Sequence, residues 1–301
     1  LAPTTILAHQ HFQNFQERLK DLPIRIEMFS RLQTKKKQRE TLERLKKGEV
    51  DIVVGTHRLF SKDVEFKRLG LLVIDDEQKF GVKQKERFRE MRSSLDVLSL
   101  SATPIPRTLY MALSSLKSIS TIQTPPEGRL PVKTTVMKRK DSIIKDAISE
   151  ELKRNGQIYY LHNRIGTMEL VRRELEKLIP IAKIGIAHAK LSESELLRMM
   201  EDFKNKKYDV LIATTIIENG IDLQNVNTLI VDNAPNLGLS QAYQLRGRVG
   251  RSHVQAHAYF LYDSKNLPEK ERLRLEALDE AQDLGSGYRI ALRDMEIRGA
   301  G

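Results

Sequence analysis

The run Leu72-Val73-Ile74-Asp75-Asp76-Glu77-Gln78 joins an apolar strand to three consecutive carboxylates. Ligands of an open α/β sheet bind at the carboxyl ends of its strands. A carboxylate at such an end can hold Mg²⁺, usually through water, while its neighbour positions an attacking water. A solvated acidic turn after a strand gives the same pattern and is the more common case. Taken alone, the run predicts a strand of an α/β sheet. The prediction of a catalytic site at the end of this strand requires further motifs.

Strands and helices are expected to alternate on both sides of this run. Short β-branched runs are separated by longer amphipathic stretches, which predicts parallel sheets covered by helices on both faces. One expected helix opens with Ser192-Glu193-Ser194-Glu195, which has the form of a capping box. Helices are expected at 34–47, 142–155, 167–178 and 192–206. Strands are expected at 24–28, 52–55, 71–74, 97–100, 134–137, 158–161, 184–187, 210–213, 228–231 and 258–261.

The stretch Thr124-Pro125-Pro126-Glu127-Gly128-Arg129-Leu130-Pro131 interrupts this alternation. Its prolines and glycine can continue neither a helix nor a central strand. It therefore predicts a linker that divides the chain into two α/β lobes. Beyond the second lobe the strand signals stop, and a charged helical stretch predicts a hairpin of two helices. The expected parts are a first lobe at 1–123, the linker at 124–131, a second lobe at 132–262 and the hairpin at 263–301.

The composition indicates a folded chain with a polyanionic partner. Hydrophobic residues make up 40% and charged residues 30% of the 301, which is typical of neither disordered nor fibrous proteins. A signal peptide and a bilayer-length apolar run are both absent, so we expect no membrane partner. The lack of cysteine excludes disulfides and thiolate metal sites and suits a reducing cytoplasm. The net charge of +11 and the pI near 9.6 favour a polyanion such as nucleic acid.

The opening residues Leu1-Ala2-Pro3-Thr4 are typical of a strand that ends in a loop. They are not preceded by a start methionine. We therefore expect the chain to be a piece of a longer protein.

The run Gln244-Leu245-Arg246-Gly247-Arg248-Val249-Gly250-Arg251 is the most specific motif of the chain. Arginines three apart are expected to share one helical face, and the glycines let that face approach another surface closely. Arginine suits planar phosphate recognition, and such residues act as arginine fingers when they face a bound triphosphate. The alternative is a basic surface helix, although glycine disfavours helices.

With this second run in place, the chain resembles the superfamily-two helicases. The acidic run resembles their motif II and the arginine run their motif VI, and the other motifs follow in the family's order across the whole chain. These are Ala2-Pro3-Thr4-Thr5-Ile6-Leu7-Ala8 (motif Ia), Gly55-Thr56-His57 (Ib), Ser101-Ala102-Thr103 (III), Tyr159-Tyr160-Leu161-His162-Asn163 (IV) and Thr214-Thr215-Ile216-Ile217-Glu218-Asn219-Gly220-Ile221-Asp222 (V).

Within the superfamily, Ala102-Thr103-Pro104-Ile105-Pro106-Arg107-Thr108-Leu109 resembles a stretch shared by RecG fork-remodelling helicases and bacterial transcription-repair coupling factors. Three further stretches favour the coupling factors over the RecG helicases. They are Glu77-Gln78, the stretch from Thr124 to Val132, and Gly250-Arg251-Ser252-His253. That resemblance implies an ATP-driven translocase on double-stranded DNA that displaces stalled RNA polymerase and couples transcription to nucleotide excision repair. RNA polymerase and excision-repair proteins would bind domains outside this chain. RecG-like fork reversal is the alternative within the class.

The resemblance also implies a fold and a nucleotide site. The fold is two RecA-like lobes followed by the helical hairpin, with ATP and Mg²⁺ bound between the lobes. Asp75 would hold Mg²⁺, Asp76 would orient the attacking water, and Gln78 would relay the nucleotide state. Arginine fingers would come from the second lobe. The implied catalytic residues are Asp75, Asp76, Gln78, Arg248 and Arg251, and the implied nucleotide-lining residues are Gly220, Asp222 and Gln244.

DNA phosphates would be bound without reading of the base sequence. The groups that would bind the phosphates are hydroxyls, amides and positive charges. Each of the residues implied as DNA contacts is equally consistent with an ordinary cap or turn. The family's hairpin couples hydrolysis to translocation through arginines that match Arg274 and Arg298. The implied DNA contacts are Thr4, Arg31, Gly55, Thr56, His57, Asn163, Thr214 and Thr215.

Two departures from the family pattern stand out. The phosphate-binding loop Gly-x-x-x-x-Gly-Lys-Thr does not occur in the 301 residues, and we expect it upstream of Leu1. Asp76 stands where the family has glutamate, and its shorter side chain displaces the carboxylate from the attacking water. Without the loop, the chain is expected to hydrolyse little ATP. A DNA-binding module that does not hydrolyse ATP is therefore a further alternative.

Overall fold

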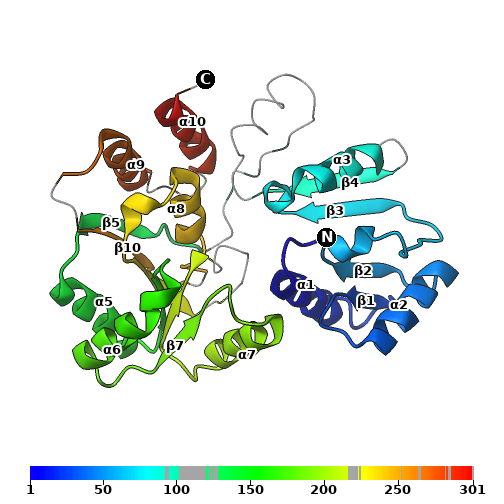
Figure 1. Ribbon diagram of the computed structural model, residues 1–301, viewed down its shortest axis with the longest axis horizontal. Helices are drawn as coiled ribbons and strands as arrows, with labels where there is room; N and C mark the ends of the chain where they lie inside the picture. The colour runs from blue at the N-terminus through cyan, green and yellow to red at the C-terminus, as the bar shows by residue number, and fades with distance from the viewer. Residues whose placement is uncertain are drawn as a thin grey trace. The chain divides into compact units, whose positions relative to one another are not determined.

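A computed structural model divides the chain into two units, Leu1–Ala102 and Thr103–Gly301, each built on parallel strands (Figure 1). The structure describes residues 1–91, 95–101, 120, 122, 124, 128–215, 223, 225–251, 253–263, 266–281, 283 and 286–299. Part of the expected linker at 124–131 lies outside these residues, and the expected lobe boundaries remain a prediction. None of the helices in the described ranges combines the length and apolar character that crossing a bilayer requires.

The first unit contains two pairs of parallel strands that the opening residues of the chain connect. The amide of Ala2 donates to the carbonyl of Gly55, 2.9 Å away, on one pair. The nitrogen of Leu1 donates to the Val73 carbonyl at 2.7 Å, and the Asp75 amide donates to the Leu1 carbonyl at 2.9 Å, on the other. The elements are α1 (Thr5–Arg18), β1 (Ile26–Phe29), α2 (Lys35–Lys47), β2 (Ile52–Gly55), β3 (Leu71–Asp75), α3 (Val82–Met91) and β4 (Asp96–Leu100), with 3₁₀ turns at His57–Phe60 and Glu77–Lys79.

The second unit is built on six parallel strands in the order β5-β10-β9-β6-β8-β7. Because all of these strands are parallel, their carboxyl ends lie at one edge of the sheet. The strands are β5 (Lys133–Lys138), β6 (Gln157–Leu161), β7 (Ile184–Ala187), β8 (Val210–Ala213), β9 (Val226–Val231) and β10 (His257–Tyr262). All ten expected strands are present, with bounds that shift by no more than two residues.

Helices cover both faces of this sheet, as the burial of every residue of β6 requires. Tyr160 packs with α5 and α6 in the main core cluster, whereas the ring of Tyr159 lies 5.6 Å from that of Phe203 on α7. The expected capping box of α7 is present at Ser192 and Glu195. The helices are α5 (Asp141–Lys153), α6 (Met168–Leu178), α7 (Glu193–Lys204), α8 (Leu239–Arg246), α9 (Glu269–Glu280) and α10 (Gly287–Arg298), with 3₁₀ turns at Ile165–Thr167 and Ala234–Asn236.

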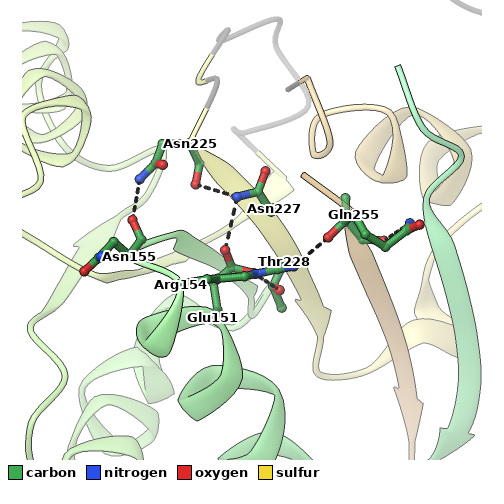
Figure 2. A network of polar contacts seen from close by, with 8 residues as sticks. Glu151, Arg154, Asn155, Asn225, Asn227, Thr228 and Gln255 are labelled. Carbon is green, nitrogen blue, oxygen red and sulfur yellow. Dashed lines mark hydrogen bonds and ion pairs between the residues drawn. The ribbon is translucent and has the colours of Figure 1, made fainter. Parts of the chain in front are cut away.

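A polar network fastens the end of α5 to the amino ends of β9 and β10 (Figure 2). At its centre is Glu151, whose side chain is fully buried and pairs with Arg154. The Glu151 carboxylate also accepts hydrogen bonds from Asn227, at 3.1 Å, and from Thr228. Arg154 donates onward to the carbonyl of Gln255 at 2.8 Å. The network lies at the edge of the sheet opposite the carboxyl ends, so we assign it to stability.

Candidate functional site

The acidic run follows β3 directly. β3 ends at Asp75, and Asp76 turns the backbone into the left-handed region, with φ 50° and ψ 52°. The Asp76 side chain is buried, and its Oδ1 accepts a 2.8 Å hydrogen bond from Nε2 of Gln78. The Asp76 carbonyl accepts a second bond of 2.8 Å from the amide of Lys79. The turn therefore gathers the three predicted residues Asp75, Asp76 and Gln78 at one strand end.

His11 joins this cluster from α1, and the sequence analysis missed it. Its Nε2 lies 2.7 Å from Oδ2 of Asp75, across 64 positions of the chain. The amide of Asp75 is bound to the Leu1 carbonyl, so the backbone and the carboxylate of Asp75 are both held. Carboxylates that bind metal ions are commonly oriented by an outer hydrogen bond of this kind.

The cluster is suited to Mg²⁺ that arrives with a nucleotide. Mg²⁺ is usually bound by one or two carboxylates, water and substrate phosphates rather than by a cage of side chains. Within the described ranges, no three His, Cys, Asp or Glu side chains are arranged to hold a metal ion by themselves. Asp75 offers one oriented carboxylate, which matches the need of Mg²⁺ for one or two carboxylate ligands.

Several predicted DNA contacts meet at the carboxyl ends of β1 and β2. Phe29 pairs with Gly55 in the register of these strands, so the residues that follow lie side by side. Nη2 of Arg31 is 3.0 Å from Nε2 of His57, and Thr56 is buried between β2 and the 3₁₀ turn. A side chain at Gly55 is excluded, because its Cβ would lie 2.4 Å from the Phe29 carbonyl oxygen.

Thr4 lies beside the same edge. Ala2, two residues earlier, is bonded to the carbonyl of Gly55. The Thr4 hydroxyl accepts a 3.3 Å hydrogen bond from the amide of Leu7 and so caps α1. The structure therefore gives Thr4 the ordinary role of a helix cap, at a position next to the other candidate contacts.

The candidate contacts of the second unit lie at the ends of neighbouring strands β6 and β8. The amide of Thr215 donates to Oδ1 of Asn163 at 3.2 Å, which ties the two loops together. Asn163 is exposed, whereas Thr214 is buried. Two residues without a predicted role adjoin them: Nδ1 of His162, a residue of motif IV, is 2.7 Å from Oδ2 of Asp232 at the end of β9.

The predicted helical face of the arginine run is wrong. α8 ends at Arg246, Gly247 is its C-cap, and Gly250 has a φ of 70° that no continuing helix allows. Arg248 and Arg251 therefore lie in the turn beyond the helix. Arg248 is buried and Arg251 is half-buried.

The other polar residues of this run are buried in α8. Gln244 and Arg246 are both buried. Nη1 of Arg246 donates to Oγ1 of Thr134 at 3.2 Å and to the Leu278 carbonyl at 3.3 Å. Its guanidinium also lies 4.8 Å from the centre of the Tyr243 ring. Arg246 is therefore a packing residue that joins α8 to β5 and α9.

The expected hairpin is present as α9 and α10, and both helices pack on α8. Oγ of Ser240 on α8 donates to Oδ2 of the fully buried Asp294 on α10, at 3.1 Å. The Nε of Arg274 is buried without a hydrogen-bond partner in the described part of the chain. Arg298 ends α10, and its side chain lies outside what the structure describes.

Some predicted site residues fall outside the described ranges. These are Gly220 and Asp222, with most of motif V, and the motif III residues Ala102 and Thr103. Their roles remain predictions.

Two family models match the chain, one in each half. The DEAD/DEAH box helicase model matches residues 1–112, and the helicase conserved C-terminal domain matches residues 139–253. With the parallel sheets and the strand-end clusters described above, these matches define a protein of the helicase class with two RecA-like lobes, followed by helices. The expected fold class is confirmed.

Over its full length the chain is homologous to the helicase region of the transcription-repair-coupling factors. It is 52% identical to that factor of Bacillus subtilis and 50% identical to that of Staphylococcus epidermidis, each over 302 residues and 100% of this chain. It spans 26% of the length of each of these relatives.

Solved structures agree with this fold. A structure of RecG bound to a three-way DNA junction is 32% identical, with a TM-score of 0.78 over 100% of this chain and 40% of that chain. Yeast Dbp5 bound to RNA and ADP BeF3 is 20% identical, with a TM-score of 0.69 over 93% of this chain and 73% of that chain. The second likeness supports the fold alone.

Proposed function

We propose that the chain is the motor of an ATP-driven translocase on double-stranded DNA, which displaces stalled RNA polymerase and couples transcription to nucleotide excision repair. The observation that carries the proposal is the end-to-end identity of 50–52% with transcription-repair-coupling factors. The RecG structure is less similar, at 32% identity, so fork remodelling is the weaker alternative. RNA polymerase and repair proteins would bind parts of a longer protein, in the bacterial cytoplasm.

The acidic cluster supports a role in hydrolysis. Mg²⁺, when bound with ATP, would neutralise the charge that develops on the phosphates. Asp75 would hold this ion, and His11 would keep its carboxylate oriented. Asp76 would orient the attacking water, and its bond to Gln78 would make that orientation sensitive to the nucleotide. Arg248 and Arg251 would reach the γ-phosphate, with Gln244, Gly220 and Asp222 lining the nucleotide.

Two clusters at strand ends support phosphate binding. In the first unit they are Thr4, Arg31, Gly55, Thr56 and His57, and in the second Asn163, Thr214 and Thr215. Groups of this kind bind the DNA backbone and leave the bases unread. A motor needs this property, because it must grip every sequence it crosses.

The test compares this chain with a loop-completed chain, in which a phosphate-binding loop with its helix and strand precedes Leu1. We expect ATP turnover that DNA stimulates from the loop-completed chain and little from the present one. Arg251→Ala should abolish this turnover and leave DNA binding unchanged. Arg289→Ala, which removes an exposed arginine of α10, is the control and should change neither.

DNA binding itself is measured on the present chain with duplexes of unrelated sequence. We expect equal affinities and a steep loss with salt, because each neutralised phosphate adds about 0.9 to the slope of log K against log salt. Binding to one base sequence alone would exclude a motor. Turnover that needs no DNA, even with the loop in place, would likewise contradict the proposal.

A further inference from the structure

A chain of hydrogen bonds closes the loop that follows β6. Nδ1 of His162 is 2.7 Å from Oδ2 of Asp232, and Nε2 of His162 is 2.7 Å from Oγ1 of Thr167, at the start of α6. The Thr167 hydroxyl donates in turn to the carbonyl of Arg164 at 3.1 Å. The bonds therefore run from the end of β9, through the imidazole, to both ends of the loop at 163–167.

The arrangement of carboxylate, imidazole and hydroxyl is similar to that of a nucleophilic triad, but the Thr167 hydroxyl also bonds to the backbone of its own loop. In a triad, the hydroxyl gives its proton to the imidazole. Here the Thr167 hydroxyl lies between Nε2 of His162, at 2.7 Å, and the Arg164 carbonyl, at 3.1 Å, and the direction of the first bond follows the tautomer of the imidazole. Whichever group donates, the imidazole bridges Asp232 and Thr167 and so joins two segments of the chain.

Asp232 is a fixed anchor for this bridge. Its side chain is 7% exposed, and its Oδ1 accepts a 2.9 Å hydrogen bond from the Tyr160 hydroxyl. Nη1 of Arg139, just after β5, lies 3.4 Å from the same oxygen. Burial, together with Asp232, raises the pKa of Tyr160, so that this hydroxyl stays protonated and keeps donating. Residues from β6 and from the ends of β5 and β6 therefore hold one carboxylate at the end of β9.

The loop presents polar groups at the carboxyl edge of the sheet. Asn163 and Arg164 are exposed, and Oδ1 of Asn163 accepts a hydrogen bond from the amide of Thr215. Within the described ranges, the Arg164 guanidinium forms no ion pair. Arginine matches the geometry of a phosphate group. A loop held at both ends keeps these groups at one spacing, which lowers the entropy lost on binding.

We propose that His162 and Asp232 are positioning residues, which hold Asn163 and Arg164 in place for contact with DNA phosphates. Arg164 is the new contact in this proposal, and Thr167 is the far attachment of the bridge. The inference rests on the DNA binding proposed above, and it adds which loop binds and what keeps that loop in shape.

The test uses a matched pair at Thr167, an exposed residue whose side chain does not cap α6. Thr167→Val keeps the shape of the side chain and removes the hydroxyl, whereas Thr167→Ser keeps the hydroxyl. Affinity for a labelled duplex is measured by fluorescence anisotropy on the full 301-residue chain over a range of salt concentrations. We expect Thr167→Val to weaken binding about fivefold, the value of one lost hydrogen bond, and Thr167→Ser to bind as the parent does.

Arg164→Ala should weaken binding and lower the salt slope by about 0.9, as loss of one phosphate contact requires. In the Arg164→Ala background, Thr167→Val should have a smaller effect, because a positioning residue acts through the group it positions. If Arg164→Ala weakens binding and Thr167→Val does not, the loop needs no bridge and the inference is overturned while the DNA-binding function stands. Additive effects overturn it as well. A parent chain that binds no duplex overturns both.

Discussion

Asp76 shows how one backbone angle limits the choice of a catalytic side chain. Its φ of 50° lies in the left-handed region, where Asp and Asn are several-fold enriched among the residues other than glycine. Their short polar side chains can bond locally, and Asp76 does so through Gln78. The aspartate that looks too short for its proposed chemistry is therefore well matched to its turn.

Replacing Asp76 by Glu separates the two effects. In the loop-completed chain, we expect Asp76→Glu to raise ATP turnover, because the longer side chain brings the carboxylate nearer to the water. The same change should lower the free energy of unfolding by about 1 kcal/mol, since glutamate tolerates the left-handed region less well. A steady-state assay of ATP turnover measures the first effect, and urea unfolding measures the second.

Asp76→Asn is the matched control for this exchange. It keeps the backbone preference and removes the charge, so stability should hold while turnover is lost. Unchanged turnover in Asp76→Glu would mean that the shorter side chain carries no catalytic cost.

At the scale of elements, local sequence predicted the strands well and the sites in part. The strands were found because each is a short β-branched run, and a buried parallel strand leaves few other options for such a run. The helical face of Arg248 and Arg251 was predicted wrongly, because Gly247 ends the helix one residue after Arg246. Helix α1 was not predicted, since its many polar residues obscure the apolar spacing.

Contacts between distant segments could not have been predicted from sequence patterns alone. His11 meets Asp75 across 64 residues, and His162 meets Asp232 across 70. His162 and Asp232 meet because the neighbouring parallel strands β6 and β9 bring their carboxyl ends to one edge, whereas His11 reaches Asp75 from helix α1. The partner of a lone histidine therefore depends on how the elements are arranged around the sheet. The sequence predicts which strands exist, but the order of strands follows from the whole sheet.

The hairpin of α9 and α10 is the element where coupling can be tested. Arg274 has a buried Nε without a partner in the described residues, and a buried donor of this kind normally finds one. We expect this donor to be bound in another state of the motor. In the loop-completed chain, Arg274→Ala should leave ATP turnover largely unchanged and abolish displacement of a triplex strand. Arg298→Ala should behave in the same way.

Arg272 provides the control on the same helix. It is exposed and pairs with Glu276 one turn further along α9, a contact of little energetic value. Arg272→Ala should therefore preserve both turnover and displacement. Full displacement by the Arg274→Ala, Arg298→Ala double variant would reduce the hairpin to a packing element.

At the scale of the whole molecule, the division into two units predicts that a destabilising substitution in one unit leaves the stability of the other unchanged. Glu151 is buried in the second unit, and removing one partner of a buried pair costs about 3–5 kcal/mol because the other charge stays unpaired. The exposure of Arg154 moderates this, and we expect Glu151→Ala to cost about 3 kcal/mol. Hydrogen exchange followed by mass spectrometry should speed up in peptides of β9 and β10.

Peptides from β1 to β4 should exchange at the parent rate in the same variant, since the network lies wholly within the second unit. Glu150→Ala is the control, because Glu150 is the exposed neighbour of Glu151 on α5. Faster exchange in both units would show that they unfold as one.

The position of β5 at the edge of its sheet has a consequence for biosynthesis. Among the described strands of the second unit, β5 is the first to leave the ribosome, and its one partner in the described sheet is β10, roughly 120 residues later in the chain. At about 5–20 residues per second, the ribosome needs roughly 6–24 s to supply that partner. During this interval β5 is an unpaired strand with both edges exposed, open to pairing with other nascent chains. Lys133 and Lys138 at its two ends place positive charges there, and like charges oppose such pairing between identical chains.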